Sequence, residues 1–136
     1  MSAGVAYLDA SAVVKLFKPE PESSPLAAAL APHEVWVASD VLTVEAACVA
    51  RRLGREGMVS LAESVVARIE LIPFTEAIRE RAAAGFSVSL RALDAVHAAS
   101  ALSVKDEITL AMVYDDDLGA ALKAEGLTVA SPAVDV

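Results

Sequence analysis

Hydrophobic residues are distributed along the chain in short runs that alternate with longer amphipathic stretches. The short runs are rich in Val, Leu and Ile, and they predict strands near residues 4–8, 34–38, 69–73, 108–114 and 127–130. The longer stretches have helical spacing and predict helices near residues 10–17, 25–31, 40–54, 59–68, 75–84, 90–103 and 116–125. Strands separated by helices indicate a parallel sheet with helices on both faces, so the expected fold class is α/β.

Four isolated carboxylates interrupt this pattern at positions where apolar residues are expected: Asp9, Glu45, Asp94 and Asp115. Asp9 and Asp115 each end an apolar run, whereas Glu45 and Asp94 interrupt the apolar face of a predicted helix. A carboxylate buried without a partner is energetically costly. Four such residues in one small domain therefore suggest a common partner, and a divalent cation is the simplest candidate.

The expected topology favours such a site. In doubly wound sheets, binding sites form beyond the carboxyl ends of the strands, where Asp9 and Asp115 lie. Two carboxylates about 5 Å apart repel by about 3 kcal/mol at an effective dielectric constant of about 20, and a bound cation reverses that sign. Mg²⁺ and Mn²⁺ prefer carboxylate ligands, whereas zinc is disfavoured because Cys48, His33 and His97 lack the spacing of a zinc site.

Each acid also has an ordinary structural explanation. Asp9, Asp94 and Asp115 lie near predicted helix starts, where N-capping is the commonest role for aspartate. Asp117 is expected to be a first-turn acid that the helix dipole favours. Glu45 has the poorest structural explanation, so we interpret the four acids together as a site, although capping would account for several of them singly.

The composition of the 136 residues restricts the class of protein. Hydrophobic residues make up 56% of the chain, which is enough for the core of a single domain spanning residues 1–136. No apolar run approaches the roughly 18 residues of a membrane span, and no secretory signal is recognised, so we expect a cytoplasmic protein without a membrane segment. The single cysteine, Cys48, lies in an apolar run and is expected to be buried.

The formal net charge of −8 bears on the partners of the protein. It argues against a non-specific nucleic-acid binder, which would have a basic surface. It does not exclude a metal-dependent enzyme that acts on a phosphodiester, because the ion supplies positive charge locally. The acidic balance also predicts attraction to a basic protein partner.

Four segments, in order along the chain, each contain one of the four acids. They are residues 7–16 (YLDASAVVKL), 39–45 (SDVLTVE), 90–101 (LRALDAVHAASA) and 114–121 (YDDDLGAA). These segments resemble the PIN-domain family, and most closely the VapC-like toxins of bacterial type II toxin–antitoxin modules. The resemblance extends over essentially the whole chain, and the first and third segments together are fairly specific.

The resemblance implies a three-layer α/β/α PIN-like domain with a central parallel sheet, and Mg²⁺- or Mn²⁺-dependent endoribonuclease activity. It implies that Asp9, Glu45, Asp94 and Asp115 form the acidic metal site at which RNA phosphodiesters are hydrolysed. Ser11 would be an accessory hydroxyl near the metal, or alternatively a cap on the first helix. The resemblance also implies a cognate antitoxin protein as partner, and a homodimer.

His97, one helical turn after Asp94, is expected to have a structural hydrogen-bonding role rather than to bind metal. Two other functions remain open. A phosphoacceptor receiver domain also uses acids at strand ends, but Leu8 rather than a second acid precedes Asp9. A catalytically inactive PIN-like module would act by binding proteins, and a metal-dependent RNA cleavage assay separates it from a nuclease.

Overall fold

The computed structural model describes residues 4–134. The strands in this range are β1 (Gly4–Leu8), β2 (His33–Ser39), β3 (Glu70–Ile72), β4 (Leu110–Met112) and β5 (Val129–Ala130). The helices are α1 (Ala10–Phe17), α2 (Ser23–Leu30), α3 (Leu42–Leu53), α4 (Met58–Ala67), α5 (Glu76–Ala84), α6 (Ala92–Ser103) and α7 (Asp116–Ala124).

The strands form one parallel sheet in the order β3-β2-β1-β4-β5, so β1 is the central strand. Tyr7 of β1 pairs with Val37 of β2 on one side and with Ala111 of β4 on the other. Parallel neighbours need long crossover connections, and the helices supply them. The carboxyl end of β1 is consequently flanked by strand ends from distant parts of the chain.

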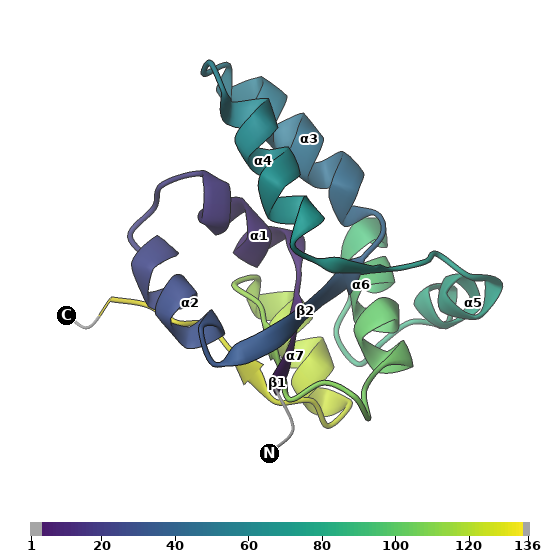
Figure 1. Ribbon diagram of the computed structural model, residues 1–136. Coiled ribbons are helices and arrows are strands. Elements are labelled where there is room, and N and C mark those ends of the chain that lie inside the picture. The colour runs from purple at the N-terminus through teal and green to yellow at the C-terminus, as the bar shows by residue number, and fades with distance from the viewer. Residues whose placement is uncertain (1–3, 135–136) are drawn as a thin grey trace.

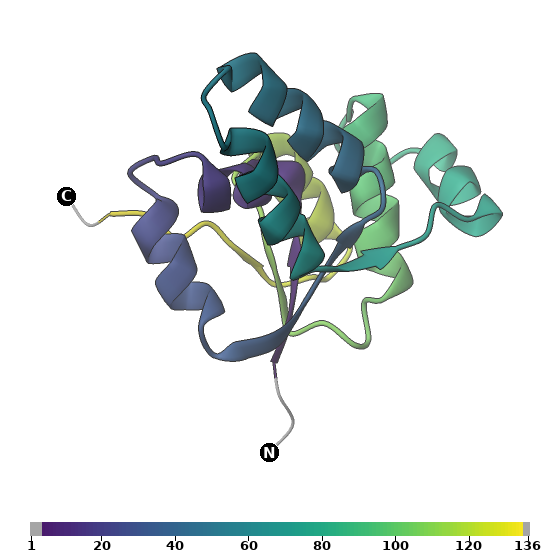
Figure 2. The ribbon, with the colours of Figure 1, turned by 45° about the horizontal axis from the view of Figure 1, so that its top comes forward.

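Helices cover both faces of this sheet and produce the three layers expected from the sequence (Figure 1 and Figure 2). Helices α1 to α4 pack on one face, around Ala6 and Leu8 of β1. Helices α6 and α7 pack on the other face, where Tyr7, Leu118 and Leu122 are buried. Successive residues of β1 therefore enter opposite cores, as the two-residue period of a strand requires.

The predicted α/β fold class is confirmed, and each predicted strand and helix is present within a few residues of its expected limits. The clearest difference is β4, which is shorter than the predicted span of residues 108–114. Ile108 donates its N–H to the Val104 carbonyl in the turn after α6, so the apolar run begins before the strand does. Among residues 4–134, no helix is long and apolar enough to cross a membrane.

Helix α3 differs from the prediction in which of its residues are buried. Leu42, Ala46 and Ala50 enter the core at four-residue spacing, while Val44 is 66% exposed and Cys48 is also exposed. The expectation that Cys48 is buried is wrong, because the small alanines, and not the cysteine, face the core shared with α1 and α4. A helical segment with apolar residues on more than one side does not indicate which of those sides packs.

Candidate active site

Asp9 directly follows the central strand and is the most buried of the four acids, with 2% of its surface exposed. Its carboxylate caps α1, because Oδ1 accepts a hydrogen bond from the Ala12 N–H at 3.0 Å. Burial raises the pKa of Asp9 from 3.8 to about 6, while hydrogen bonds from Ser11 and Ala12 oppose the rise. The capping role considered for Asp9 is therefore present, but it leaves the ionised carboxylate poorly solvated.

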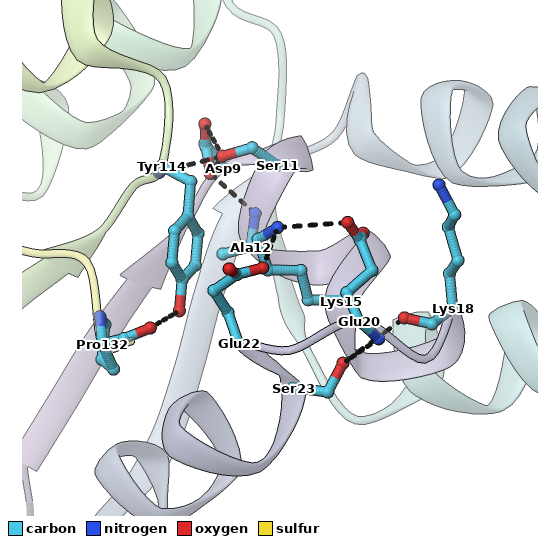
Figure 3. A network of polar contacts seen from close by, with 10 residues as sticks. All are labelled: Asp9, Ser11, Ala12, Lys15, Lys18, Glu20, Glu22, Ser23, Tyr114 and Pro132. Carbon is cyan, nitrogen blue, oxygen red and sulfur yellow. Dashed lines mark hydrogen bonds and ion pairs between the residues drawn. The ribbon is translucent and has the colours of Figure 1, made fainter. Parts of the chain in front are cut away.

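Ser11 connects the carboxyl ends of β1 and β4 (Figure 3). Its Oγ donates to the Asp9 carboxylate, whose oxygens are 2.7 and 2.8 Å away, and accepts the Tyr114 N–H at 3.0 Å. The alternative in which Ser11 caps the first helix is wrong, because Asp9 occupies the N-cap position. Ser11 instead holds the carboxylate of Asp9 against the segment that leads to Asp115.

Glu45 lies in the first turn of α3 and is joined to α6 by His97. Glu45 Oε1 is 2.6 Å from His97 Nε2, and the two side chains are 19% and 1% exposed, respectively. On the other side of the ring, the Tyr7 hydroxyl is 3.1 Å from His97 Nδ1 and donates to the His97 carbonyl at 3.0 Å. His97 thus has the hydrogen-bonding role expected for it, and Glu45 is its partner.

Asp94 and Asp115 line one polar pocket of about 370 Å³, together with Asp117 and Arg91. Asp94 lies in the first turn of α6, and Asp115 caps α7 by accepting the Leu118 N–H at 2.8 Å. Asp117 lies in the first turn of α7, where the helix dipole favours an acid. The pocket is therefore acidic on the side of α7 and carries one arginine at the start of α6.

Asp94 interacts electrostatically with the other three acids. Burial raises the pKa of Asp94, and the charges of Asp115 and Glu45 raise it further, whereas His97 lowers it. The charge of Asp94 in turn contributes to the raised pKa of Asp9. The four acids, which follow β1, lie in α3 and α6, and precede α7, are consequently linked by electrostatic interactions through Asp94.

The four acids do not yet form a closed coordination shell. Within residues 4–134, no three His, Cys, Asp or Glu side chains lie close enough together to hold one ion as they stand. Each of three carboxylates is engaged by a protein donor instead: Asp9 by Ser11 and Ala12, Glu45 by His97, and Asp115 by Leu118. The donor set itself, carboxylates with a neighbouring hydroxyl, fits a hard cation such as Mg²⁺.

A larger cavity of about 470 Å³ lies between α3 and α4, beside β3. Its lining is mainly apolar, with Ala46, Val59, Ala62 and Val66 among the residues, and it contains none of the four acids. The smaller polar pocket beside Asp94 is therefore the cavity with groups capable of chemistry.

Two tyrosines of this region were not predicted. Tyr7 is fully buried and bonds His97, and Tyr114 is half-buried and donates its hydroxyl proton to the Pro132 carbonyl at 2.6 Å. A tyrosine inside an apolar strand is itself a signal, since a buried hydroxyl needs a partner. Both tyrosines lie within two residues of a predicted acid, so the signal was present in the sequence.

Lys15 of α1 is paired with two glutamates rather than left available to a ligand (Figure 3). Its Nζ is 3.1 Å from Glu22 Oε1 and 3.5 Å from Glu20 Oε2, and it lies 4.7 Å from the centre of the Tyr114 ring. The hydrogen bond from Lys15 lowers the pKa of Glu22. These contacts fasten the loop between α1 and α2 against the segment that carries Asp115.

Comparisons with known proteins agree with this architecture. The PIN domain family model matches residues 6–121. Two curated relatives from Mycobacterium tuberculosis are Ribonuclease VapC47, 32% identical, and Ribonuclease VapC35, 35% identical; each alignment spans 130 residues and covers 93% of this chain and 96% of the relative.

A solved structure has the same fold. The crystal structure of Mycobacterium tuberculosis VapC20, described as a Sarcin-Ricin loop cleaving toxin, matches with a TM-score of 0.68 at 18% sequence identity. The match covers 90% of this chain and 96% of VapC20. On the family model and the curated relatives, the chain belongs to the PIN-domain family, in the group of the VapC ribonucleases.

Proposed function

We propose that this protein is a divalent-metal-dependent endoribonuclease, the toxin of a type II toxin–antitoxin system. The observation that supports the proposal is the polar pocket that Asp94 and Asp115 line, with Asp9 and Glu45 near enough to interact electrostatically with Asp94. The curated relatives, which align over nearly the whole chain, are named ribonucleases, and this supports the same class of reaction.

Asp9, Glu45, Asp94 and Asp115 would hold Mg²⁺ or Mn²⁺ in this proposal. The bound ion supplies a Lewis acid for the phosphodiester and lowers the pKa of a coordinated water. Ser11 holds the Asp9 carboxylate beside the segment that follows β4, by donating to it while accepting the Tyr114 N–H. The carboxylates also supply the positions that can accept a proton from the attacking water.

The proposed substrate is single-stranded or structured RNA. A chain with a net charge of −8 repels phosphate, so the approach of RNA depends on positive charge inside the site. A bound metal would supply part of that charge, and Arg91 in the polar pocket offers a further cation that can pair with a phosphate oxygen.

The test is RNA cleavage with and without millimolar Mn²⁺, using wild type, Asp9→Asn and Asp106→Asn. Asp106 is an exposed acid in the turn between α6 and β4, so it controls for loss of one negative charge. We expect Asp9→Asn to reduce cleavage by about 100-fold or more, and Asp106→Asn to leave it unchanged. If the wild type shows no metal-dependent cleavage, the nuclease proposal is contradicted, and the catalytically inactive protein-binding module is favoured instead.

An antitoxin is the protein partner in this proposal. A basic segment of such a protein can enter the acidic region and pair with Asp94 or Asp9 through charge-assisted hydrogen bonds. The product of a small adjacent reading frame, purified with this chain, should suppress RNA cleavage. Rising salt should weaken the complex and restore cleavage. A complex that forms but leaves cleavage intact would exclude occlusion of the site.

The homodimer remains a prediction from the resemblance. Sedimentation equilibrium of the purified chain at micromolar concentration measures it directly, and a monomer over the whole concentration range contradicts it.

A further inference from the structure

The ring of His97 connects the three elements that carry Asp9, Asp94 and Glu45. His97 lies on α6, three residues after Asp94, and contacts Glu45 of α3 through Nε2 and Tyr7 of β1 through Nδ1. Tyr7 lies two residues before Asp9 on the central strand. One buried imidazole, 1% exposed, therefore sets the position of α3 and its acid relative to the other two acidic elements.

Tyr7 determines how the imidazole is oriented. The Tyr7 hydroxyl has one proton, which it donates to the His97 carbonyl at 3.0 Å. Its oxygen, 3.1 Å from Nδ1, then accepts the Nδ1–H, and because Nε2 must also carry a hydrogen to donate to the Glu45 carboxylate, the ring in this arrangement has a proton on both nitrogens. Because both atoms of this contact are buried in the core, the ring is held with Nε2 directed at Glu45.

The contact with His97 occupies one oxygen of Glu45. Oε1 lies 2.6 Å from Nε2, whereas Oε2 has no hydrogen-bond partner among residues 4–134. A free glutamate side chain has several rotamers, and fastening one oxygen to a buried ring removes most of them. The carboxylate is thereby presented with a single oxygen available to another ligand.

We propose that Tyr7 and His97 are positioning residues that hold Glu45 by Oε1 and leave Oε2 as its only oxygen for a divalent cation. This inference rests on the proposed metal-dependent nuclease. Partners that orient a metal ligand commonly change metal affinity or activity by about 10- to 100-fold when they are removed. A purely structural His97 would affect the stability of the fold and leave the metal dependence unchanged.

The test measures Mn²⁺ affinity without RNA, by titration calorimetry and by the rise in melting temperature with Mn²⁺. His97→Leu should weaken Mn²⁺ binding by about 10-fold or more, and His97→Gln, which retains a donor, should recover much of the loss. Tyr7→Phe removes only the hydroxyl oxygen that contacts His97, so it should also weaken Mn²⁺ binding, but by less than His97→Leu does. Ser100→Ala, a change at a fully buried serine of the same helix, controls for repacking of α6.

A double-mutant cycle separates positioning from a general structural effect. In a Glu45→Gln background, His97→Leu should weaken Mn²⁺ binding little further, because the side chain that it positions has already lost its charge. Equal losses in the two backgrounds, or an unchanged affinity in both, would overturn the positioning role.

The outcome for the wild type keeps the two proposals distinct. If wild-type protein binds no Mn²⁺ and shows no metal-dependent cleavage, the proposed function itself fails. If the wild type binds Mn²⁺ and neither Tyr7→Phe nor His97→Leu changes the affinity, only the positioning role fails. Tyr7→Phe decides the matter even if His97→Leu does not fold, because an unchanged Mn²⁺ affinity in that variant contradicts the positioning role.

Discussion

At the scale of single residues, Asp9 combines two roles that pull in opposite directions. Its carboxylate caps α1, which stabilises the helix, yet it is buried at the end of the central strand, which penalises its charge. Burial is the larger effect and raises the pKa of Asp9 from 3.8 to about 6, so the carboxylate binds a proton more readily in the folded state than in the unfolded state.

The pH dependence of stability follows from this shift. Between pH 3.8 and about 6, the folded state keeps a proton on Asp9 that the unfolded state has released. The free energy of unfolding therefore falls as pH rises through this window, by roughly 3 kcal/mol at most, and stays lower above it. In Asp9→Asn this component should be absent, since asparagine has no proton to lose and still caps a helix.

Urea unfolding of both proteins in chelator at pH 4.5 and pH 7.5 measures the effect. Asp9→Asn should be the more stable protein at pH 7.5, by about 1–3 kcal/mol, and the difference should shrink at the lower pH. A variant that is less stable than wild type at pH 7.5 would show that capping, rather than burial of charge, dominates at Asp9.

Ser11 provides a second prediction at this scale. Ser11→Ala leaves the Tyr114 N–H without its acceptor and removes a hydrogen bond that lowers the pKa of Asp9. We expect a loss of about 1–2 kcal/mol in the free energy of unfolding and a further rise in the Asp9 pKa. Ser64→Ala, at an exposed serine whose hydroxyl bonds the Ser60 carbonyl within α4, is the matched control and should change neither quantity appreciably.

At the scale of elements, the strands and helices were predicted closely from the sequence. Their apolar residues repeat with different periods, and glycines follow several helix ends. Gly54 is the C-cap of α3 and Gly126 follows the C-cap of α7, and they adopt positive φ of 65° and 90°, as expected at the C-terminal ends of helices. The burial within α3 was not predictable in the same way. Its run from Val41 to Ala50 is apolar on several sides, so only the packing partners, α1 and α4, select the buried face.

The exposed position of Cys48 can be checked in solution. A disulfide reagent such as Ellman's should modify Cys48 in the native protein at a rate within a few-fold of that in urea-unfolded protein, because the thiol is exposed on α3. A reaction that requires unfolding would place Cys48 in an interface or in the core.

The candidate site was predictable to different extents for its different parts. Asp9 and Asp115 stand out because an acid directly follows an apolar strand, and Asp94 and Glu45 because an acid interrupts an apolar helix face. The contacts that hold Glu45 were not accessible, since His97 is separated from Tyr7 by 90 positions and from Glu45 by 52. Contacts of that kind are set by the strand order, which one sequence does not reveal.

At the scale of the whole molecule, the position of β1 at the centre of the sheet makes the fold depend on pairings between distant segments. Residues 6–8 of β1 pair with residues 110–112 of β4, while the other edge of β1 pairs with β2. Pairings of high sequence separation form late, because the entropy of loop closure must be overcome first.

A fragment of residues 1–109 tests this dependence. It contains Asp9, Glu45 and Asp94 but lacks β4. One edge of β1 therefore has no partner strand, and the Tyr114 N–H that donates to Ser11 is missing. We expect no cooperative urea transition and no rise in melting temperature with Mn²⁺. A folded, Mn²⁺-binding fragment would show that β4 and Asp115 are dispensable.

The central position of β1 also bears on how the protein is synthesised. A chain leaves the ribosome from its N-terminus, so β1 emerges long before β4, with which it must pair. Until β4 has emerged, the acids of β1, α3 and α6 belong to a sheet without one of its two central pairings. For a protein that we propose cleaves RNA, this order means that β4 must be synthesised before the growing chain can attack the RNA around it.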